Sequence, residues 1–276
     1  MTTKRVLAVG AHPDDVEFMC AGLLILLREA GCEIHVATLS LGDVGSMACD
    51  PEELRRIRRE EATTASGVIG ATYHALDFWD FSIFNDDQSN RRVTGLLREV
   101  DPSIVITHPP QDYLADHEAT STLVRNGCFY ASVPNYESSQ GTSAVRTSSI
   151  PYLYYAHPME GTDNFGCPVV PQMFIDITSV FSLKRNMLAC HKSQRDWLRQ
   201  QHGIDEYVES MGRWGRMLGW QASAICGRPV ECAEAYRQHR GHAYPQHNVL
   251  AELLAGFTIP ESTSGIVANV KQETKA

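Results

Sequence analysis

The sequence lacks several features that mark membrane and nucleic-acid-binding proteins. No apolar run approaches the roughly 18–20 residues that a membrane-spanning helix needs. Basic residues are outnumbered, with 24 Lys and Arg against 33 Asp and Glu, so the formal net charge is −9. This balance argues against broad binding to nucleic-acid phosphates and against docking on an anionic membrane. We therefore expect no nucleic-acid partner and no membrane span.

The usual nucleotide-binding and cysteine motifs are also absent. Neither the G-x-x-x-x-G-K phosphate loop nor the G-x-G-x-x-G fingerprint occurs, which gives a nucleotide-dependent role little support. The eight cysteines form no C-x-x-C pair and no small-domain framework. The basic start, residues 1–5, resembles part of a signal peptide, but the apolar run behind it stops at His12. We expect buried, reduced thiols and a cytoplasmic protein.

The sequence is long and apolar enough for one large domain. It has 276 residues, 43% of them apolar, which permits a sizeable core. We expect a single domain over residues 1–260 and a polar, flexible tail over 261–276. A strand over 5–10, a helix over 16–30 and a strand over 33–39 would form a βαβ unit, which places its two strands parallel.

The alternation of strands and helices continues along the chain. Asp50 at the N-cap and Pro51 at the first position open a second helix. Further patterns predict helices over 51–69, 91–100, 118–131, 180–201 and 230–240, strands over 73–76, 103–107, 150–156 and 172–177, and a mobile loop over 132–149. The alternation predicts an α/β fold with a mostly parallel sheet and helices on both faces. Such sheets place their sites beyond the carboxyl ends of the strands.

Two polar segments stand at that edge and contain the residues of a metal site. His12 and Asp15 lie three apart on a turn from strand to helix, and His117 follows a later strand. A catalytic zinc ion takes three protein ligands and leaves a position for water, whose pKa falls towards about 7. Asp14, a second carboxylate beside that water, is the candidate general base.

Each segment also has an ordinary interpretation. Adjacent aspartates before a helix, such as Asp14 and Asp15, are common as N-caps, and an isolated pair such as Asp116-His117 is usually a surface or capping feature. The joint pattern favours the metal site, because both segments follow apolar strands, precede helices and fall at the same edge of the sheet.

The first segment resembles the signature of a known family. Ala11-His12-Pro13-Asp14-Asp15, followed by Glu17, is similar to the signature of the LmbE-like (PIG-L) N-acetylglucosaminyl deacetylases. The resemblance continues, in order, through Arg58-Arg59-Glu60-Glu61 before Gly70, Asp116-His117, Phe174-Ile175-Asp176-Ile177-Thr178, Leu183-Lys184 and His191-Lys192-Ser193-Gln194.

The resemblance implies a Rossmann-like fold and a zinc-dependent hydrolase, although another divalent cation would suit the same ligands. It implies zinc on His12, Asp15 and His117, with Asp14 as the base. The reaction implied is removal of an N-acetyl or other N-acyl group from an amino sugar or sugar conjugate, a small-molecule partner. It also makes a homo-oligomer plausible.

Two further positions align with substrate-binding residues of the family. These are Arg58 and Asp80. Arg58 has an alternative as a helix-surface ion pair with Glu61. Asp80 has an alternative as an ordinary turn residue.

One departure from the family concerns the group that steadies the oxyanion. Many members carry a histidine where this chain has Leu114, which can donate neither a proton nor a hydrogen bond. His108 and Tyr113 in the same loop are possible replacements, and Asp116 is retained as a partner that orients a histidine. Another source, from this chain or from a neighbouring subunit, is the histidine-rich stretch with His239, His242 and His247.

Other functions stay open. The site also suits an amidase for a different N-acyl or thiol-conjugate substrate. Because Leu114 replaces a histidine, a third interpretation is a non-catalytic relative that binds a sugar. The aromatic and acidic stretch 78–84 is either a sugar platform or a packed loop. Helical patterns place the three later tryptophans, Trp197, Trp214 and Trp220, more readily in the core than against a ligand.

Overall fold

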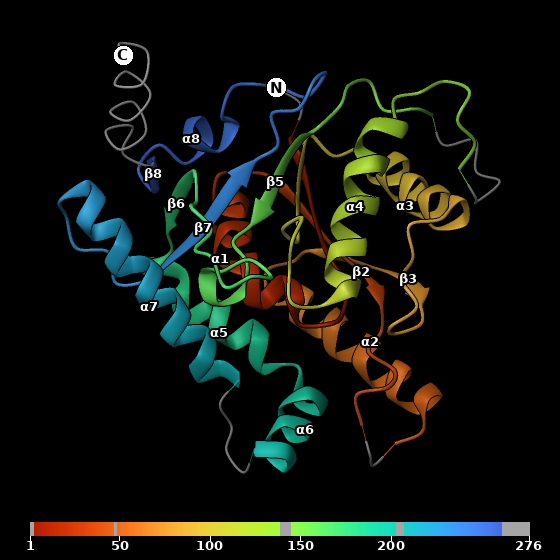
Figure 1. The fold of residues 1–276 in the computed structure, drawn as a ribbon, viewed down its shortest axis with the longest axis horizontal. Coiled ribbons are helices and arrows are strands. Elements are labelled where there is room, and N and C mark those ends of the chain that lie inside the picture. The colour runs from red at the N-terminus through yellow and green to blue at the C-terminus, as the bar shows by residue number, and fades with distance from the viewer. Residues whose placement is uncertain (1–2, 47–48, 139–144, 203–206, 261–276) are drawn as a thin grey trace, which may run out of the picture.

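The protein is built on one eight-stranded sheet, as Figure 1 shows for this computed structural model. The structure describes residues 3–46, 49–138, 145–202 and 207–260. The strand order is β3-β2-β1-β4-β5-β7-β6-β8. Neighbouring strands are parallel from β3 to β5, namely β1 (Arg5–Gly10), β2 (Glu33–Ser40), β3 (Thr72–Phe78), β4 (Ile104–Thr107) and β5 (Tyr152–Ala156). The pairings beyond β5 are antiparallel and involve β6 (Met173–Asp176), β7 (Ala233–Gln238) and β8 (Thr258–Pro260).

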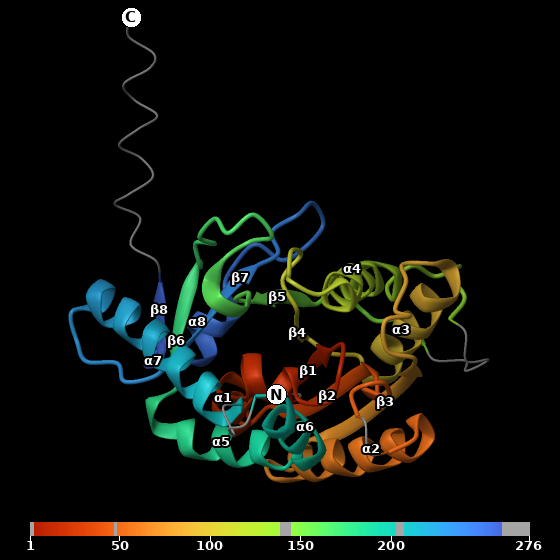
Figure 2. The same ribbon diagram turned by 60° about the horizontal axis from the view of Figure 1, so that its bottom comes forward.

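Helices cover both faces of the sheet. In Figure 2, α3 and α4 lie on one side of the parallel strands, and α1, α2 and α5 lie on the other. The helices are α1 (Asp15–Glu29), α2 (Pro51–Gly67), α3 (Asp87–Val100), α4 (Ala115–Tyr130), α5 (Phe181–Ala189), α6 (Lys192–His202), α7 (Tyr207–Cys226) and α8 (Val249–Leu253). Short 3₁₀ turns occupy Met159–Gly161 and Thr178–Val180. The predicted fold class, α/β with a mostly parallel sheet and helices on both faces, is confirmed.

Strand β1 is apolar from Val6 to Gly10 because both of its faces are covered there. Val6 and Ala8 join the core that contains α1, whereas Leu7 and Val9 join the core beneath α3 and α4. Side chains alternate between the faces of a strand, so a strand buried on both sides needs apolar residues at every position. The continuous apolar run therefore predicted this central strand correctly.

The strand order reverses at β1, and this reversal positions the site. The chain proceeds from β1 to β2 and β3 on one side, then returns to pair β4 with the other side of β1. A reversal of this kind leaves a crevice beyond the carboxyl ends of the two central strands. The loops that leave β1 and β4 carry residues 12–15 and 108–117, so the two predicted segments face one crevice.

Two of the predicted helices are wrong. The helix expected over 230–240 is strand β7, paired with β5 and β6. Ala233, Glu234 and Ala235 suit a helix by propensity, but pairing with two distant strands overrides this preference. The long helix expected over 180–201 is interrupted at Cys190 and His191, where buried His191 turns towards Glu17, with 3.4 Å between Nε2 and Oε1.

Several smaller expectations have different outcomes. The caps predicted at Asp50 and Pro51 are present, and the Asp50 carboxylate accepts a hydrogen bond from the backbone N–H of Glu53.

The eight cysteines are free thiols. None of the described helices combines the length and the apolar character needed to cross a membrane. The tail over 261–276 and part of the predicted loop, 139–144, lie outside the described residues.

Candidate active site

A cavity of about 650 Å³ lies beyond the carboxyl ends of β1 and β4. Its lining brings together nearly all of the site residues that the sequence singled out, namely His12, Asp14, Asp15, Arg58, Asp80, His108, Tyr113, Leu114 and His117. Asp116 lies behind this lining, in contact with His12. Residues from four separate segments therefore meet in one cavity.

The turn after β1 places Asp14 in the cavity with an unusual backbone. Its φ is +100°, in the left-handed region, which a residue other than glycine adopts only when its surroundings hold it there. Asp14 occupies the N-cap position of α1, yet its side chain makes no capping hydrogen bond. The ordinary interpretation of Asp14 as a capping side chain is therefore wrong, and its buried carboxylate is directed to other partners.

Those partners control the ionisation of Asp14. Burial and the neighbouring charge of Asp15 raise the pKa of Asp14 to about 6, while His191, Arg58 and a hydrogen bond with the Tyr207 hydroxyl act in the opposite direction. A carboxylate with a pKa near neutrality can accept a proton and return it within one reaction, which suits a general base.

Asp15 lies between two histidines. Its Oδ2 accepts a hydrogen bond from the backbone N–H of His12 at 2.7 Å and lies 3.5 Å from His12 Nδ1. Its Oδ1 lies 3.5 Å from His117 Nε2. Burial alone would raise the pKa of Asp15, but His117 and His108 hold it well below its usual value. Asp15 is thus a carboxylate anion whose two oxygens face two imidazole rings.

Each of those histidines is held from behind by a second carboxylate. His12 Nε2 lies 3.1 Å from Asp116 Oδ2, and His117 Nδ1 lies 3.1 Å from Asp112 Oδ1. The remaining nitrogen of each ring faces Asp15. Histidines that bind metals commonly have this arrangement, in which a carboxylate fixes the ring and its tautomer. Sequence reasoning missed Asp112, although an acid five residues before His117 in the same loop was a usable signal.

The donor atoms fit a divalent cation. The side chains of His12, Asp15 and His117 each offer one donor atom, and these atoms lie within 4.8 Å of one another. Two imidazole nitrogens and one carboxylate oxygen suit zinc and related ions. Two other clusters meet the same distance limit, but they use Asp112 or Asp116 as a ligand. The first cluster alone leaves a supporting carboxylate for each histidine, so it fits best.

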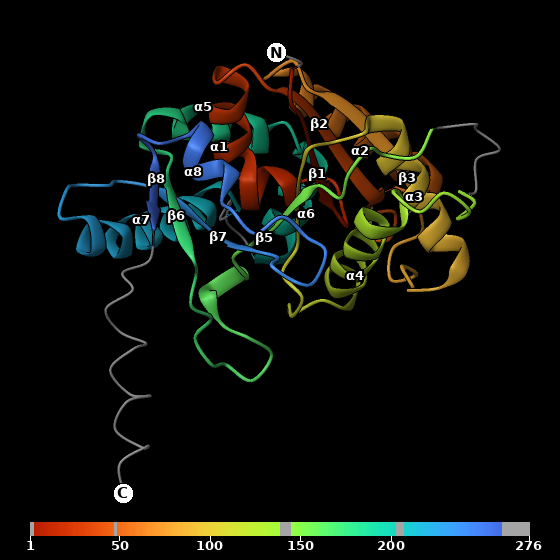
Figure 3. The ribbon, with the colours of Figure 1, turned by 90° about the horizontal axis from the view of Figure 1, so that it is seen from above.

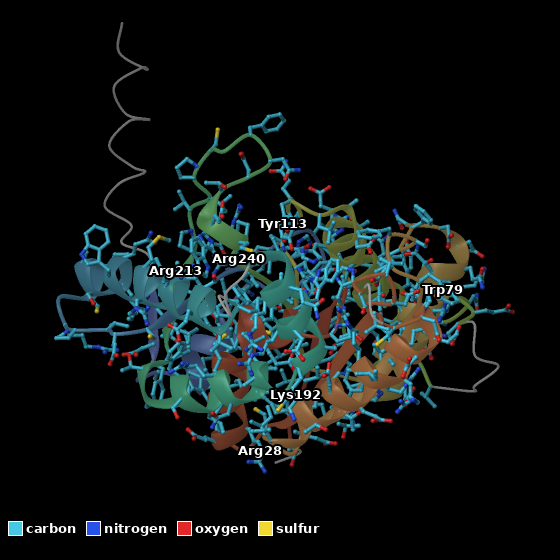
Figure 4. The ribbon with its side chains drawn as sticks, turned by 90° about the horizontal axis from the view of Figure 1, so that it is seen from below. Arg28, Trp79, Tyr113, Lys192, Arg213 and Arg240 are labelled. Carbon is cyan, nitrogen blue, oxygen red and sulfur yellow. The ribbon has the colours of Figure 1, made fainter. Side chains whose placement is uncertain are left out.

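The loop around Leu114 offers two polar side chains. His108 is buried, stacks on His117 with 4.0 Å between ring centroids, and has a pKa lowered by burial and by His117. Its Nε2 lies 3.1 Å from Asp15 Oδ2, so it is already engaged. Tyr113, labelled in Figure 4, is 69% exposed, lines the cavity and meets the His117 ring edge-on. Neither is a free buried donor.

Tyr207 provides a donor that sequence reasoning missed. It begins α7, lines the cavity, and stacks on Phe18 with ring centroids 5.7 Å apart. Its hydroxyl makes a hydrogen bond with the Asp14 carboxylate. Burial, followed by the charges of Asp14 and Asp15, raises the pKa of Tyr207 well above its usual value, so the hydroxyl keeps its proton. No local motif marks Tyr207, because its partners lie on the first helix.

Arg58 is a buried cavity residue rather than a surface ion pair. One guanidinium nitrogen donates to the Gly45 carbonyl at 3.1 Å and to Gln194 Oε1 at 2.6 Å. Glu61, its expected alternative partner, instead accepts hydrogen bonds from Ser193. The alternative interpretation of Arg58 is therefore wrong.

Asp80 lines the cavity but is engaged by the loop after β2. Its carboxylate accepts hydrogen bonds from the Ser40 hydroxyl and from the backbone N–H of Gly42 at 3.1 Å. It also lies 3.8 Å from His12 Nε2. These bonds tie two loops together beside His12, so Asp80 has the contacts of a positioning residue.

The aromatic residues divide between the cavity and the outer surface. Phe81 is 63% exposed and lines the cavity, whereas Trp79 lies outside the lining and stands apart from Tyr113 in Figure 4. The core placement expected for three tryptophans is wrong for Trp220, which is 73% exposed. Trp214 packs at the border of a small core and also lines the cavity, and Trp197 lines the cavity.

The histidine-rich stretch near the C-terminus lies outside the cavity lining in the described part of the chain. His239 packs edge-on against Tyr244, and His247 contacts Tyr152. Within this chain, these histidines do not replace the missing donor at Leu114.

Comparison with known proteins gives a family and several relatives. Residues 7–128 match the PIG-L family, described as GlcNAc-PI de-N-acetylase, which confirms the predicted resemblance. The 4-oxalmesaconate hydratase of Pseudomonas putida is 29% identical over 199 residues, covering 69% of this chain and 74% of that protein. The diacetylchitobiose deacetylase of Thermococcus kodakarensis is 26% identical over 199 residues, covering 69% and 70%.

A solved structure supports the same fold. The N,N'-diacetylchitobiose deacetylase from Pyrococcus horikoshii superimposes with a TM-score of 0.72 at 20% identity. The alignment covers 89% of this chain and 88% of that one. The architecture is therefore that of the LmbE-like deacetylases.

Proposed function

We propose that this PIG-L-like chain is a zinc-dependent hydrolase that removes an N-acetyl or other N-acyl group from an amino sugar or sugar conjugate. One observation carries the proposal: a three-donor cluster, His12, Asp15 and His117, lies beside a buried carboxylate, Asp14, that serves neither as a cap nor as a ligand. The names of the relatives support the substrate class, because deacetylases of acetylated sugars are among them.

The reaction follows from the positions of the side chains. A divalent cation on the three donors would supply Lewis acidity for the water and for the amide carbonyl. Asp14 accepts the proton of the attacking water, because its pKa of about 6 leaves it ionised at neutral pH. The same carboxyl group then donates that proton to the departing amine.

Tyr207 is our replacement for the histidine that Leu114 cannot supply. Its hydroxyl keeps its proton and bonds Asp14, and once Asp14 has accepted the proton of the water, the hydroxyl can instead donate its hydrogen bond to the oxygen that becomes negative. Arg58, whose buried Nε has no hydrogen-bond partner, also lines the cavity and contributes positive charge near Asp14. These two residues steady charge during the reaction, and Asp112 and Asp116 hold the histidines.

A hydratase is the second candidate, favoured by the 29% identical relative. A hydratase for an oxo acid needs cations to bind its carboxylates. Arg58 and Lys184 are the Lys or Arg residues that line the cavity in the described part of the chain. Lys184 is paired with Glu234, whereas Arg58 donates to two neutral acceptors, the Gly45 carbonyl and Gln194, and keeps its charge. A cavity with one such cation suits a neutral amide better than an oxo acid with several carboxylates.

The test begins with metal content and a panel of substrates. We expect near-stoichiometric zinc or a similar ion in the purified protein, and amine release from N-acyl amino sugars that a chelator abolishes. Substituting Asp14→Asn should retain the metal and lower turnover about 10²-fold or more. Asp196→Asn, on a side chain that is 64% exposed, is the matched control and should leave turnover unchanged.

The other outcomes are informative. Near-full activity of the Asp14→Asn protein would show that the base is assigned wrongly. A metal-free protein that binds sugars without cleaving them would be the non-catalytic relative. Hydration of an unsaturated oxo acid without amine release from any amide, thiol conjugates included, would replace the hydrolase with a hydratase.

A further inference from the structure

One end of the cavity has no part in the proposed reaction. We call it the apolar end. Its walls come from α7, from β7 and from the loop after β5, and they consist of Met211, Trp214, Leu218, Ala235, His157 and Met159. Helix α7 packs on the sheet through this region, where Leu218 and Ala235 share a small core with Trp214 at its border.

The charged groups beneath this end are fully paired. Lys184 Nζ lies 2.6 Å from Glu234 Oε1 and donates to the Phe18 carbonyl at 2.7 Å. Glu234 also accepts hydrogen bonds from the backbone N–H groups of Gly22 and Leu23, each at 2.8 Å. A buried ion pair whose hydrogen bonds are satisfied within the protein offers little to a ligand. The charges of Lys184 and Glu234, beneath the apolar end, therefore neutralise each other and are not free to bind a ligand.

The polar side chain in the wall is neutral. His157 stacks on Trp214 with 6.2 Å between ring centroids and 19° between planes. Burial, followed by the charge of Arg237, lowers the pKa of His157 to about 4, so the ring is uncharged at neutral pH. Its Nδ1 is buried without a hydrogen-bond partner. This end thus presents a flat, uncharged aromatic surface.

The size and chemistry of the cavity restrict what it accepts. A volume of about 650 Å³ falls within the roughly 300–1,000 Å³ of pockets for drug-sized ligands, far more than an acetyl group fills. A second sugar ring would need many hydrogen-bond partners, whereas the walls named above consist mostly of apolar and aromatic side chains. A carboxylate would need a free cation, and Lys184 is already paired.

We propose that the apolar end binds an apolar group, an aromatic ring or a medium-length alkyl chain, carried by the substrate. Trp214 and His157 supply the flat surface against which the group packs, and Met211 and Leu218 complete the wall. Only the assignment of this group to an N-acyl amino sugar rests on the proposed function.

The experiment measures binding without turnover. Chelator-treated protein is titrated by calorimetry with two pairs of ligands: N-octanoylglucosamine against N-acetylglucosamine, and phenyl against methyl N-acetyl-β-glucosaminide. We expect the apolar member of at least one pair to bind about tenfold tighter or more, because burying each additional methylene is favourable. The first pair places the apolar group on the acyl side, and the second places it on the other side.

Matched variants on one helix locate the effect. Trp214→Ala should reduce the preference for the apolar ligand at least fivefold, whereas Trp220→Ala, at an exposed position on α7, should retain it. If Trp214→Ala does not fold, Met159→Ser at a 41% exposed wall position should weaken the preference about twofold.

Equal binding within both pairs would overturn the proposal, as would a preference that survives the wall substitutions. A preference that is lost in Trp214→Ala while no amide is cleaved would support the apolar site and contradict the proposed hydrolase, so the two failures are distinguishable.

Discussion

The two ends of the cavity are built from different parts of the molecule. The histidine end consists of His12, Asp15 and His117, which lie in the turn after β1 and in the first turns of α1 and α4, beyond the carboxyl ends of parallel strands. The apolar end is made by α7 where it crosses antiparallel β7, beside a loop that projects from the body of the protein in Figure 3. One end holds charged groups in hydrogen-bonded positions, and the other offers packing surface.

This difference suggests a division of roles, in which the histidine end carries out the reaction and the apolar end selects the substrate. Groups at the histidine end are fixed by carboxylates and by a strained turn, so substitutions there should change turnover or metal binding more than stability. Groups at the apolar end contribute to the core, so substitutions there should change stability and substrate preference. The predictions below test this division, from the largest expected effect to the smallest.

The buried pair beneath the apolar end should have the largest effect on stability. Lys184→Ala leaves Glu234 buried without its cation, and we expect unfolding to become easier by about 3–5 kcal/mol. Denaturant unfolding measures this change. Arg185→Ala is the matched control, because its pair with Glu209 is 48% and 59% exposed and should contribute at most about 1 kcal/mol. Equal losses in the two variants would contradict the prediction.

Asp112→Asn tests the support of His117 at the histidine end. A neutral amide orients the ring less strongly, and we expect metal affinity to fall about 10- to 100-fold with little change in stability. Competition with a chelator measures the affinity. Asp87→Asn, on a side chain that is 75% exposed, should leave it unchanged. Unaltered metal affinity in Asp112→Asn would remove Asp112 from the site.

Tyr207→Phe tests the donor that α7 brings to the histidine end. The variant loses only the hydroxyl, and we expect kcat to fall about tenfold while metal content is retained. Steady-state kinetics measures the effect. Tyr113→Phe, at the exposed rim, should change kcat less than threefold. The opposite ranking of the two tyrosines would assign the oxyanion donor to Tyr113.

His157 should give the apolar end a pH-dependent stability. Its pKa is lowered from 6.5 to about 4 in the folded protein, so between these values the unfolded chain binds more protons. Stability therefore falls as the pH falls through this window, by about 1 kcal/mol between pH 7.5 and 5.5. Between pH 7.5 and 5.5 the unaltered protein should lose about 1 kcal/mol of stability relative to His157→Phe, measured by denaturant unfolding at each pH, and a difference that does not change with pH would contradict the shift.

The sequence predicted the parallel half of the fold and the two polar loops well, because their signals are local. Apolar strand runs, the Asp50 cap and the polar residues after β1 can all be recognised within a few positions. Strand β7 was missed, since its pairing with β5 and β6 outweighs the helical preference of its alanines. The support of His117 by Asp112 and the contact of Tyr207 with Asp14 exist only through space. The roles of the site residues stay predictions.

The left-handed backbone at Asp14 has a consequence for engineering. A residue with a side chain pays roughly 1–2 kcal/mol in this conformation, whereas glycine adopts it freely. Asp14→Gly would also remove a buried carboxylate from beside Asp15. A selection for heat resistance alone should therefore enrich glycine at position 14 and discard the proposed base. Variants selected for thermal stability should be assayed for turnover after every round of selection, because at residue 14 the change that increases stability removes the proposed base.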